Sequence, residues 1–339
     1  MAANNFVKAV KKKWNDNSLA DGLLVKRRSQ EFVFNIFTIS LIIGLCFAIL
    51  YPIIKIFPVI FNDVEDLGSP DIVWVPIRWS VISFKAAIRL VFGNFVTMAQ
   101  SLLYSAVIAA IQVFVCSMAG YTLGRIKSKF NDIIFILVIV TFVVPPQSLL
   151  ISQYLRFKQF DVFGLFKLFT GSTIDLINQP ITLFILAFFG FGLKQSLFVF
   201  QFRQFFKGLP GELEEAAYID GCGFYQTFFR IALPNAVPAI MTVSILSFVW
   251  NYGDTYYTGY FHPKGPYLSI ALNQTFASTN ANNVVTAVQT WYDKPGATTF
   301  AFDAVKQAAA LIYLAPLLII YFLIQKRFVE NFERSGIVG

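Results

Sequence analysis

The residues best suited to hold a ligand lie close together near position 250. The stretch contains Trp250, Asn251, Tyr252, Asp254, Thr255, Tyr256 and Tyr257. Aromatic faces with amide and carboxylate edges suit a sugar, because sugars have apolar C–H faces and many hydroxyl groups. The alternative interpretation is an aromatic belt at a membrane–water interface. Asp254 favours binding, since a carboxylate within an apolar span is costly unless it serves a cavity or a partner.

Lys194 is a second charge inside an apolar stretch. If a helix begins at Pro180, this lysine lies about 21 Å along it, near the middle of a membrane span. Three roles are open: Lys194 lines a pathway, pairs with an acidic group of a partner, or lies nearer to an end of the span.

Enzymatic chemistry is not indicated by the remaining residues. The chain has no G-x-x-x-x-G-K-[ST] phosphate loop and no G-x-S-x-G motif. Its one histidine, His262, stands beside Pro263 in a predicted loop, and no Cys, His and carboxylate cluster has metal-ligand spacing. We therefore expect no catalytic residue, no metal site and no cofactor in this chain.

Composition indicates that lipid is the solvent. Hydrophobic residues make up 56% of the 339 residues and charged residues 14%, and there are 39 phenylalanines. A soluble domain usually has about 25% charged residues, so this chain has too much apolar surface for a single globular core. Its cysteines, Cys46, Cys116 and Cys222, form no disulfide framework. The apolar runs start after about 30 polar residues, which predicts a retained anchor rather than a cleaved signal peptide.

Six stretches are apolar enough to cross a bilayer, which needs about 20 residues of helix. They run from Phe32 to Ile54, Phe95 to Leu123, Ile133 to Ile151, Ile181 to about Phe206, Val237 to about Phe261, and Ala304 to Ile324. Pro145-Pro146 interrupts the third and predicts a kink, either structural or part of a moving gate. Small residues of the second, including Ala109 and Gly120, predict close helix packing. The predicted fold is an all-α integral membrane protein with about six transmembrane helices.

Basic residues predict the orientation of these spans. The N-terminal tail contains Lys8, Lys11, Lys12, Lys13, Lys26, Arg27 and Arg28. This cluster predicts a cytoplasmic N-terminus, and six spans then place both termini in the cytoplasm. The net charge of +8 therefore reflects topology rather than nucleic-acid binding. Arg156, Lys158 and Lys167 weaken the bias, because they fall in an outer loop whose regularly spaced phenylalanines suggest a segment lying in the interface.

The loop between the predicted fourth and fifth spans forms two short helices in this interpretation. Pro210 suits the first turn of a helix, and Glu214 and Glu215 lie near the positive end of its dipole. Ala217 and its neighbour are small enough for another surface to approach closely, and Gly221 is a plausible helix stop. The pattern indicates either a docking surface parallel to the membrane or an ordinary interhelical loop.

The same loop resembles the EAA motif of permease subunits in binding-protein-dependent ABC importers. That motif is Glu-Ala-Ala, three residues, Gly, nine residues, Ile, one residue and Leu-Pro. The chain has Glu215, Ala216, Ala217, Gly221, Ile231, Leu233 and Pro234 at every required spacing. The resemblance implies a coupling helix that fits a cleft of an ATPase subunit, with Glu215 paired to a basic group there. We include the neighbouring Glu214 and Asp220 in this predicted coupling site.

The resemblance extends from about Phe95 to Arg327, and the last residues are similar to the tail of maltose-type carbohydrate permeases. Pro145-Pro146-Gln147 and Trp250-Asn251 also resemble that group, so Gln147 joins the predicted substrate pathway. The stretches Ser152 to Gln179 and Tyr267 to Asp303 are longer than the family pattern. The implied organisation is a cytoplasmic tail (1–31), a first span with an external segment (32–94), a permease core (95–327) and a cytoplasmic tail (328–339).

The resemblance also implies partners. They are a second, homologous permease chain, two ATPase subunits that bind ATP and Mg, an extracytoplasmic solute-binding protein, a carbohydrate, and the lipid of the cytoplasmic membrane. A permease for a peptide, an amino acid or another non-sugar solute is the alternative. A channel or a membrane enzyme without an ATPase is a third hypothesis.

Overall fold

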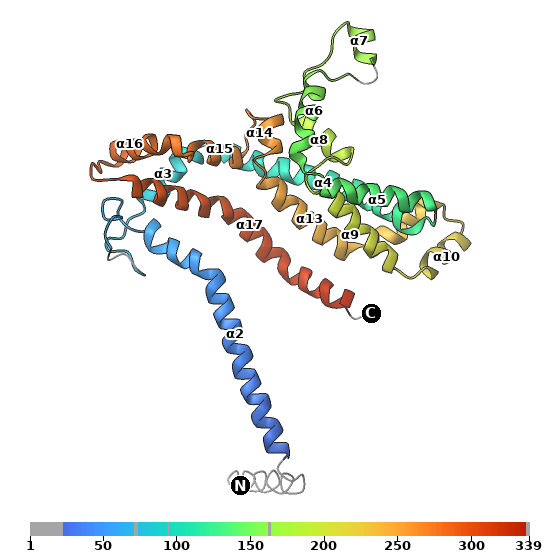
Figure 1. Ribbon diagram of the computed structural model, residues 1–339, viewed down its shortest axis with the longest axis horizontal. Coiled ribbons are helices and arrows are strands. Elements are labelled where there is room, and N and C mark those ends of the chain that lie inside the picture. The colour runs from blue at the N-terminus through green and yellow to red at the C-terminus, as the bar shows by residue number, and fades with distance from the viewer. Residues whose placement is uncertain (1–22, 71–73, 94, 162–163, 337–339) are drawn as a thin grey trace. The chain divides into compact units, whose positions relative to one another are not determined.

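The computed structural model describes residues 23–70, 74–93, 95–161 and 164–336 of the chain. These residues form helices joined by loops (Figure 1), and their only strand-like pairings are the isolated bridges Asn62–Trp79 and Phe160–Ile174. The predicted all-helical class is confirmed. The N-terminal tail up to residue 22 lies outside the described residues.

Three helices are each long and apolar enough to cross a membrane. They are Gln30–Ile60 within α2 (Leu23–Ile60), Val96–Arg125 within α4 (Phe95–Arg125), and Thr299–Gln325 within α17 (Thr299–Gly336). They coincide with the predicted first, second and sixth spans. Two further spans are present if each of two sharply bent helix pairs counts as one. The predicted total of six stays a prediction.

The predicted third span is broken where the proline pair stands. Helix α5 (Lys129–Val143) and helix α6 (Pro146–Lys158) meet at 98°. Pro146 occupies the first turn of α6, where its missing N–H costs no hydrogen bond. A short helix α7 (Leu165–Thr170) follows in the loop after α6.

The predicted fourth span is not one continuous helix, so that prediction is wrong. Helix α8 (Pro180–Phe188) ends early, and helix α9 (Gln195–Gly208) begins after a six-residue break. Gly190 in the break has φ of +87°, and Lys194 has φ of +56° in the left-handed region. A Cβ at Gly192 would lie 2.6 Å from Oε1 of Gln195 and 3.2 Å from Cα of Ala187, so a larger residue there would displace Gln195.

The predicted fifth span ends earlier than expected. A short run ending in α12 (Leu233–Asn235) bends by 78° into α13 (Val237–Tyr252), and the separate helix α14 (Tyr257–Phe261) comes afterwards. Backbone N–H groups of Tyr257 and Thr258 donate to the Asp254 carboxylate at 3.2 and 2.8 Å. This capping starts α14 and fixes the end of the span near Tyr252.

The chain divides into two compact units, residues 1–81 and 82–339. In the first unit, the end of α2 carries an aromatic cluster. The Lys55 ammonium lies 5.8 Å from the ring centre of Tyr51 and 5.4 Å from that of Trp74. These cation–π contacts attach the loop after α2 to the last turns of the helix.

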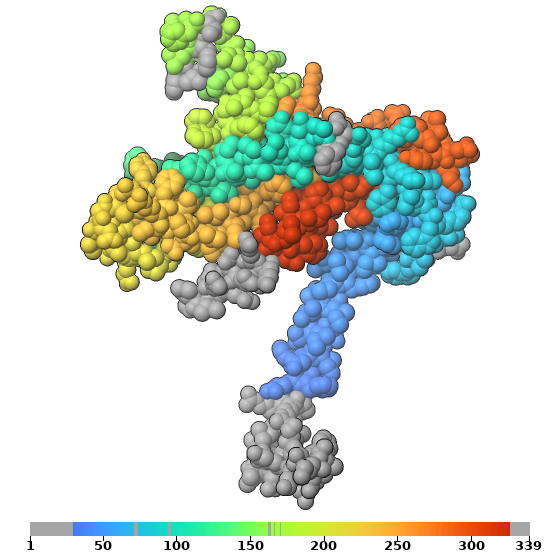
Figure 2. Space-filling view, turned by 180° about the vertical axis from the view of Figure 1, so that it is seen from behind, coloured from blue at the N-terminus to red at the C-terminus, as the bar shows by residue number. Residues whose placement is uncertain are grey.

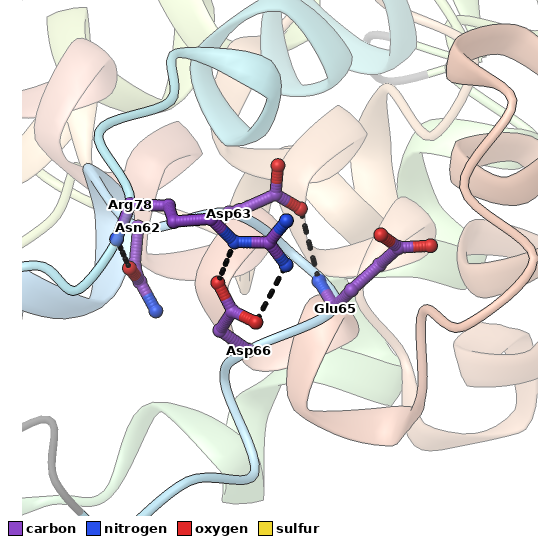
Figure 3. A network of polar contacts seen from close by, with 5 residues as sticks. All are labelled: Asn62, Asp63, Glu65, Asp66 and Arg78. Atoms are coloured by element: carbon purple, nitrogen blue, oxygen red, sulfur yellow. Dashed lines mark hydrogen bonds and ion pairs between the residues drawn. The ribbon is translucent and has the colours of Figure 1, made fainter.

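A polar network closes the loop that follows α2 (Figure 3). Both Nε and Nη2 of Arg78 contact the Asp66 carboxylate, the latter at 2.6 Å from Oδ1. The backbone N–H of Arg78 donates to Oδ1 of Asn62 at 3.0 Å, and that of Glu65 donates to Oδ1 of Asp63 at 3.2 Å. The network joins the two ends of the loop without regular strands.

In the second unit, α4 is the central helix and packs against α8, α9 and α13. The glycines of the sequence Gly120-Tyr-Thr-Leu-Gly124 allow its close approach to α9, because a Cβ at Gly120 would lie 2.5 Å from Cβ of Phe202. This is the small-residue packing expected between helices in lipid. A core of large side chains surrounds the contact. It includes Cys116, Tyr121, Phe198, Phe202, Phe206, Phe228 and Val243.

The two ends of this unit carry different short helices (Figure 1). Helix α10 (Glu212–Ile219) lies at one end, and α15 (Leu268–Thr275) and α16 (Ala281–Tyr292) lie at the other, where α3 (Ile82–Val91) also packs. A 3-10 turn, η2 (Ser278–Asn280), joins α15 to α16. The long helices of this unit therefore separate the end that carries α10 from the end that carries α3, α15 and α16.

Candidate functional site

The 209–235 segment contains the predicted docking helix. It comprises α10, α11 (Phe224–Thr227), the π-helical turn η1 (Phe228–Ala232) and α12. Gly221 has φ of +82°, and the N–H of Cys222 donates to the Ala217 carbonyl at 2.9 Å. This is the glycine-terminated helix end that the sequence predicted.

Side chains of α10 divide into a buried face and an exposed face. Ala217 is 2% exposed and packs inward, whereas Glu215, Ala216 and Asp220 are exposed. Among the other predicted coupling residues, Ile231 and Leu233 are half-buried and Pro234 is exposed. Glu215 is therefore accessible at the surface, and Ala217 packs against its own protein.

Glu214 is bound within the chain rather than presented outward. Its Oε1 lies 2.8 Å from Nε of Arg125, the last residue of α4. Nη2 of the same arginine donates to the carbonyls of Leu209 at 2.9 Å and Pro210 at 3.4 Å. Arg125 was not predicted from the sequence as part of this site. A basic residue directly after an apolar span is usually assigned to topology, and its partner lies far away in the sequence.

Aromatic side chains hold the rest of the segment against α4. The ring centre of Tyr121 lies 5.3 Å from that of Phe206, 5.2 Å from that of Phe224 and 5.1 Å from that of Phe228. Such clustered rings contribute packing beyond their buried area. The segment is therefore attached to α4 by the ion pair and hydrogen bonds of Arg125 and by the aromatic cluster around Tyr121.

Large apolar side chains remain uncovered on this segment, which is the yellow end of the unit in Figure 2. They are Leu213, Tyr218, Ile219, Tyr225 and Phe229, and Ile219 is 86% exposed. Together with the exposed carboxylates they form a mixed apolar and acidic surface. A surface of this kind suits protein–protein contact.

The residues predicted to bind a ligand near position 250 do not share one exposed surface. Asn251 is buried, and its Nδ2 donates to Oε1 of Gln112 on α4 at 2.9 Å. Ser247 also donates to Gln112, whose own Nε2 donates to the Leu193 carbonyl at 3.1 Å. This buried network connects α4, α13 and the break between α8 and α9.

Neighbouring candidates are likewise held inside the protein. Tyr252 stacks on Tyr313 of α17 at 4.6 Å, and each hydroxyl donates to the other residue's carbonyl. Asp254 is 8% exposed and caps α14, as described above. Trp250 is half-buried and stacks on Phe198 at 5.6 Å, and Tyr256 is half-buried with its ring 5.3 Å from that of Tyr260.

Lys194 and Gln147 are exposed, and both lie at breaks in the helices. The Lys194 ammonium lies 5.5 Å from the ring centre of Phe142 on α5. A hollow of about 670 Å³ adjoins the break between α8 and α9, and it is bordered by α4, α5 and the first turns of α9. Its lining is mainly apolar, with polar groups such as Thr122, Thr141 and Ser196.

The loop after α14 contains the single histidine, which is buried rather than exposed. His262 is 7% exposed, and its Nδ1 lies 3.3 Å from the Tyr267 hydroxyl. Burial lowers the pKa of His262 below its ordinary value, because the imidazolium would lose water. Gly265 permits this turn, since a Cβ there would lie 2.7 Å from Nδ1 of His262.

The long apolar helices and the all-helical fold define a multi-pass helical membrane protein. Residues 116–334 match the family described as binding-protein-dependent transport system inner membrane component. The chain belongs to that family, as the EAA-like loop predicted. Members of this family are permease subunits of ABC transporters, which is the class that the sequence predicted.

Relatives of the chain are named as carbohydrate permeases. A probable permease for starch degradation products from Thermoanaerobacterium thermosulfurigenes is 33% identical over 41% of this chain. The chain spans only 44% of that relative's length. A diacetylchitobiose uptake permease of Streptomyces coelicolor is 25% identical over 90% of this chain and 96% of its own length. A melibiose/raffinose/stachyose import permease of Bacillus subtilis is 26% identical over 66% of this chain and 68% of its own length.

A solved structure has the same fold. It is a bacterial ABC transporter involved in import of the acidic polysaccharide alginate, and the TM-score is 0.65. The match covers 87% of this chain and 96% of that chain at 18% identity. At this identity the likeness concerns the fold alone.

Proposed function

We propose that the chain is the membrane-spanning permease subunit of an ABC importer that takes up a carbohydrate. The observation that supports this most directly is the 209–235 segment, which presents Glu215 and Ala216 on an exposed helix at one end of the helical core. A partner ATPase would bind this surface and would supply the free energy by hydrolysing ATP with bound Mg. The named substrates of the relatives support a carbohydrate as cargo.

In this proposal one chain forms half of the translocation pathway. A second, homologous permease would supply the other half, two ATPase subunits would bind on the cytoplasmic side, and a solute-binding protein would deliver the cargo outside. The basic N-terminal tail supports a cytoplasmic N-terminus. The proposed organisation is a tail (1–31), a first span with an external segment (32–94), a six-span arrangement completed by the core (95–327), and a cytoplasmic tail (328–339).

The residues of the coupling site would have two kinds of role. Glu215, Ala216 and Asp220 are exposed and would contact the ATPase. Ala217 and Gly221 would hold α10 in shape, and Ile231, Leu233 and Pro234 would join the segment to the fifth span.

The proposed substrate pathway also has two kinds of residue. Lys194, Gln147, Trp250 and Tyr256 are at least partly exposed and would face the cargo. Asn251, Tyr252 and Asp254 would shape the pathway from inside through their buried contacts. The hollow beside the break between α8 and α9 would hold the cargo, and Lys194 lies in that break.

Co-purification with an ATPase subunit tests the proposal. We expect Glu215→Lys to abolish binding of the ATPase, because an exposed carboxylate on the docking helix would become a like charge for the basic group that it meets. Asp303→Lys is the matched control, since it makes the same charge change at an exposed carboxylate of α17. Unchanged ATPase binding by Glu215→Lys would contradict the proposed coupling surface.

The cargo class is tested with the assembled transporter. We expect oligosaccharides, loaded on the binding protein, to stimulate ATP hydrolysis. Stimulation by peptides or amino acids instead would favour the alternative, an ABC permease for a non-sugar solute. Transport that continues without ATP would favour a channel.

A further inference from the structure

The last turns of α4 hold two different elements at once. Gly120 and Gly124 are four residues apart and face α9, and Tyr121 and Arg125 are four residues apart and face the 209–235 segment. Residues at this spacing lie on one face of a helix, so each pair forms a continuous strip. The end of α4 therefore connects α9 to the segment that bears the exposed coupling surface.

Gly120 and Gly124 form a glycine strip, which brings the backbones of α4 and α9 into contact. A Cβ at Gly120 would lie 2.9 Å from the backbone N of Arg203, and one at Gly124 would lie 3.2 Å from its carbonyl oxygen. Backbone-to-backbone contact leaves no side chain that could rotate to absorb a displacement. A movement of α4 along this strip must therefore move α9.

Arg125 connects α4 to α10. The Arg125 guanidinium contacts the Glu214 carboxylate and the carbonyls of Leu209 and Pro210, so one side chain binds both the end of α9 and the docking helix. The Arg125 side chain is 15% exposed and that of Glu214 13%. Nε of Arg125 and Oε1 of Glu214 form a close ion contact without hydrogen-bond geometry. Water is largely excluded from this contact, so its Coulomb attraction is screened less than that of a surface pair.

Helix α10 has only eight residues. A helix this short is not stable by itself, so its position depends on the contacts that it makes. Its described contacts are the Arg125–Glu214 ion pair and its packing on α11 and η1, in which Ala217 is buried. Within the described part of the chain, the Arg125–Glu214 contact is the only ion pair that joins α10 to one of the long apolar helices.

Another arginine, Arg203 of α9, extends the connection to α5. Arg203 of α9 is 6% exposed, and its Nε donates to the Leu123 carbonyl of α4 at 3.2 Å. Its Nη2 lies 3.4 Å from Oδ1 of Asp132, and its guanidinium lies 3.6 Å from the ring centre of Phe135. Both Asp132 and Phe135 belong to α5, which borders the hollow described above.

We propose that the Arg125–Glu214 ion pair is the positioning contact that passes displacement of the ATPase-docking helix into the transmembrane helices. In this proposal Arg125 transfers movement of α10 to α4, the glycine strip transfers it to α9, and Arg203 transfers it to α5. The inference rests on the proposed function. It assigns transmission to Glu214, and it leaves contact with the ATPase to the exposed Glu215.

The test separates coupling from assembly. Arg125→Glu and Glu214→Arg are made singly and together in the full transporter, reconstituted with its ATPase, second permease and binding protein. Three quantities are measured: co-purified ATPase, ATP hydrolysed, and sugar transported per ATP. Lys127→Glu is the matched control, because it reverses an exposed charge two residues beyond Arg125. The neutral variants Arg125→Gln and Glu214→Gln are included in case a buried like-charge pair prevents folding.

We expect the single variants to bind the ATPase but to transport less sugar per ATP, by on the order of tenfold, as for a typical loss of coupling between sites. The exchanged pair Arg125→Glu with Glu214→Arg should recover most of the wild-type ratio, and Lys127→Glu should match it. A wild-type ratio in every single and neutral variant would overturn the inference. Loss of ATPase binding in the neutral variants, without recovery in the exchanged pair, would also overturn it, since the contact would then only shape the docking surface.

Failure of the inference can be distinguished from failure of the proposed function. If the wild-type chain binds no ATPase subunit, the proposed function is overturned and the inference with it. If the wild-type chain binds the ATPase and transports sugar while the Arg125 and Glu214 variants behave like it, the inference alone is overturned.

Discussion

At the scale of single residues, Gly120 and Gly44 show how similar positions differ in their surroundings. Both lie inside long apolar helices, but a Cβ at Gly44 would meet nothing within 4 Å. A Cβ at Gly120 would lie 2.5 Å from Cβ of Phe202, which is closer than real Cβ contacts allow. We expect Gly120→Ala to lower the free energy of unfolding by about 1–3 kcal/mol, because α4 and α9 must separate.

The measurement is thermal unfolding of the purified protein in detergent. Gly44→Ala is the control, and it should be neutral or slightly stabilising, since alanine favours a helix over glycine by about 0.5–1 kcal/mol. Equal melting temperatures for the two variants would show that the α4–α9 contact is looser than the described distances indicate.

The individual residues near position 250 also show what a sequence can and cannot predict. Their polar and aromatic character predicted a substrate pathway, and that assignment stays a prediction. Asn251, however, donates to Gln112, which lies 139 residues away in the sequence. No local pattern identifies such a partner, so the sequence could not separate buried structural groups from groups that face a ligand.

At the scale of elements, the turn between α14 and α15 should respond to pH. His262 is buried within this turn, and its pKa is lowered by burial. The folded protein therefore favours the neutral imidazole, while the unfolded chain takes up a proton near the ordinary pKa of about 6.5. Stability contributed by the neutral ring is fully present above about pH 6.5 and is lost as the pH falls from there towards the folded-state pKa.

Melting temperatures of the wild-type protein and of His262→Phe, measured from about pH 8 to about pH 5, check this expectation. The wild-type protein should lose stability on acidification more steeply than the variant, which has no imidazole to protonate. The variant also loses the contact with Tyr267, so the difference in slope is the informative quantity, not the difference in melting temperature. Parallel curves would contradict the assignment of the pH response to His262.

The local sequence predicted some of the helix boundaries and missed others. The helices α2, α4 and α17 were predictable because apolar length is a local property, and the break at Pro145-Pro146 was predictable because proline removes a backbone donor. The break near Gly192 was missed, although two glycines in Phe189-Gly-Phe-Gly192 were an available signal. Its geometry depends on the side chain of Gln112, which lies 81 residues before Leu193 in the sequence, as well as on that of the nearby Gln195.

At the scale of the whole molecule, the two compact units should contribute differently to ATPase binding. Every described contact that holds the 209–235 segment, including those of Tyr121, Arg125 and Phe206, lies within the unit 82–339. The family match, residues 116–334, also lies in that unit. We therefore expect residues 1–81 to be replaceable by an unrelated single-span helix with a basic N-terminal tail, without loss of ATPase binding. The basic tail is kept because it should orient the remaining spans as in the natural chain.

The exchange is checked by membrane insertion and by co-purification of the ATPase with the replaced chain. The same replaced chain with Glu215→Lys serves as the control, and it should insert but bind no ATPase, because the exposed carboxylate of α10 is the group expected to meet the partner. A replaced chain that inserts normally but binds no ATPase would show that the first unit takes part in the docking surface. Retained binding would show instead that the core unit positions its own 209–235 segment, as the contacts of α4 with that segment require.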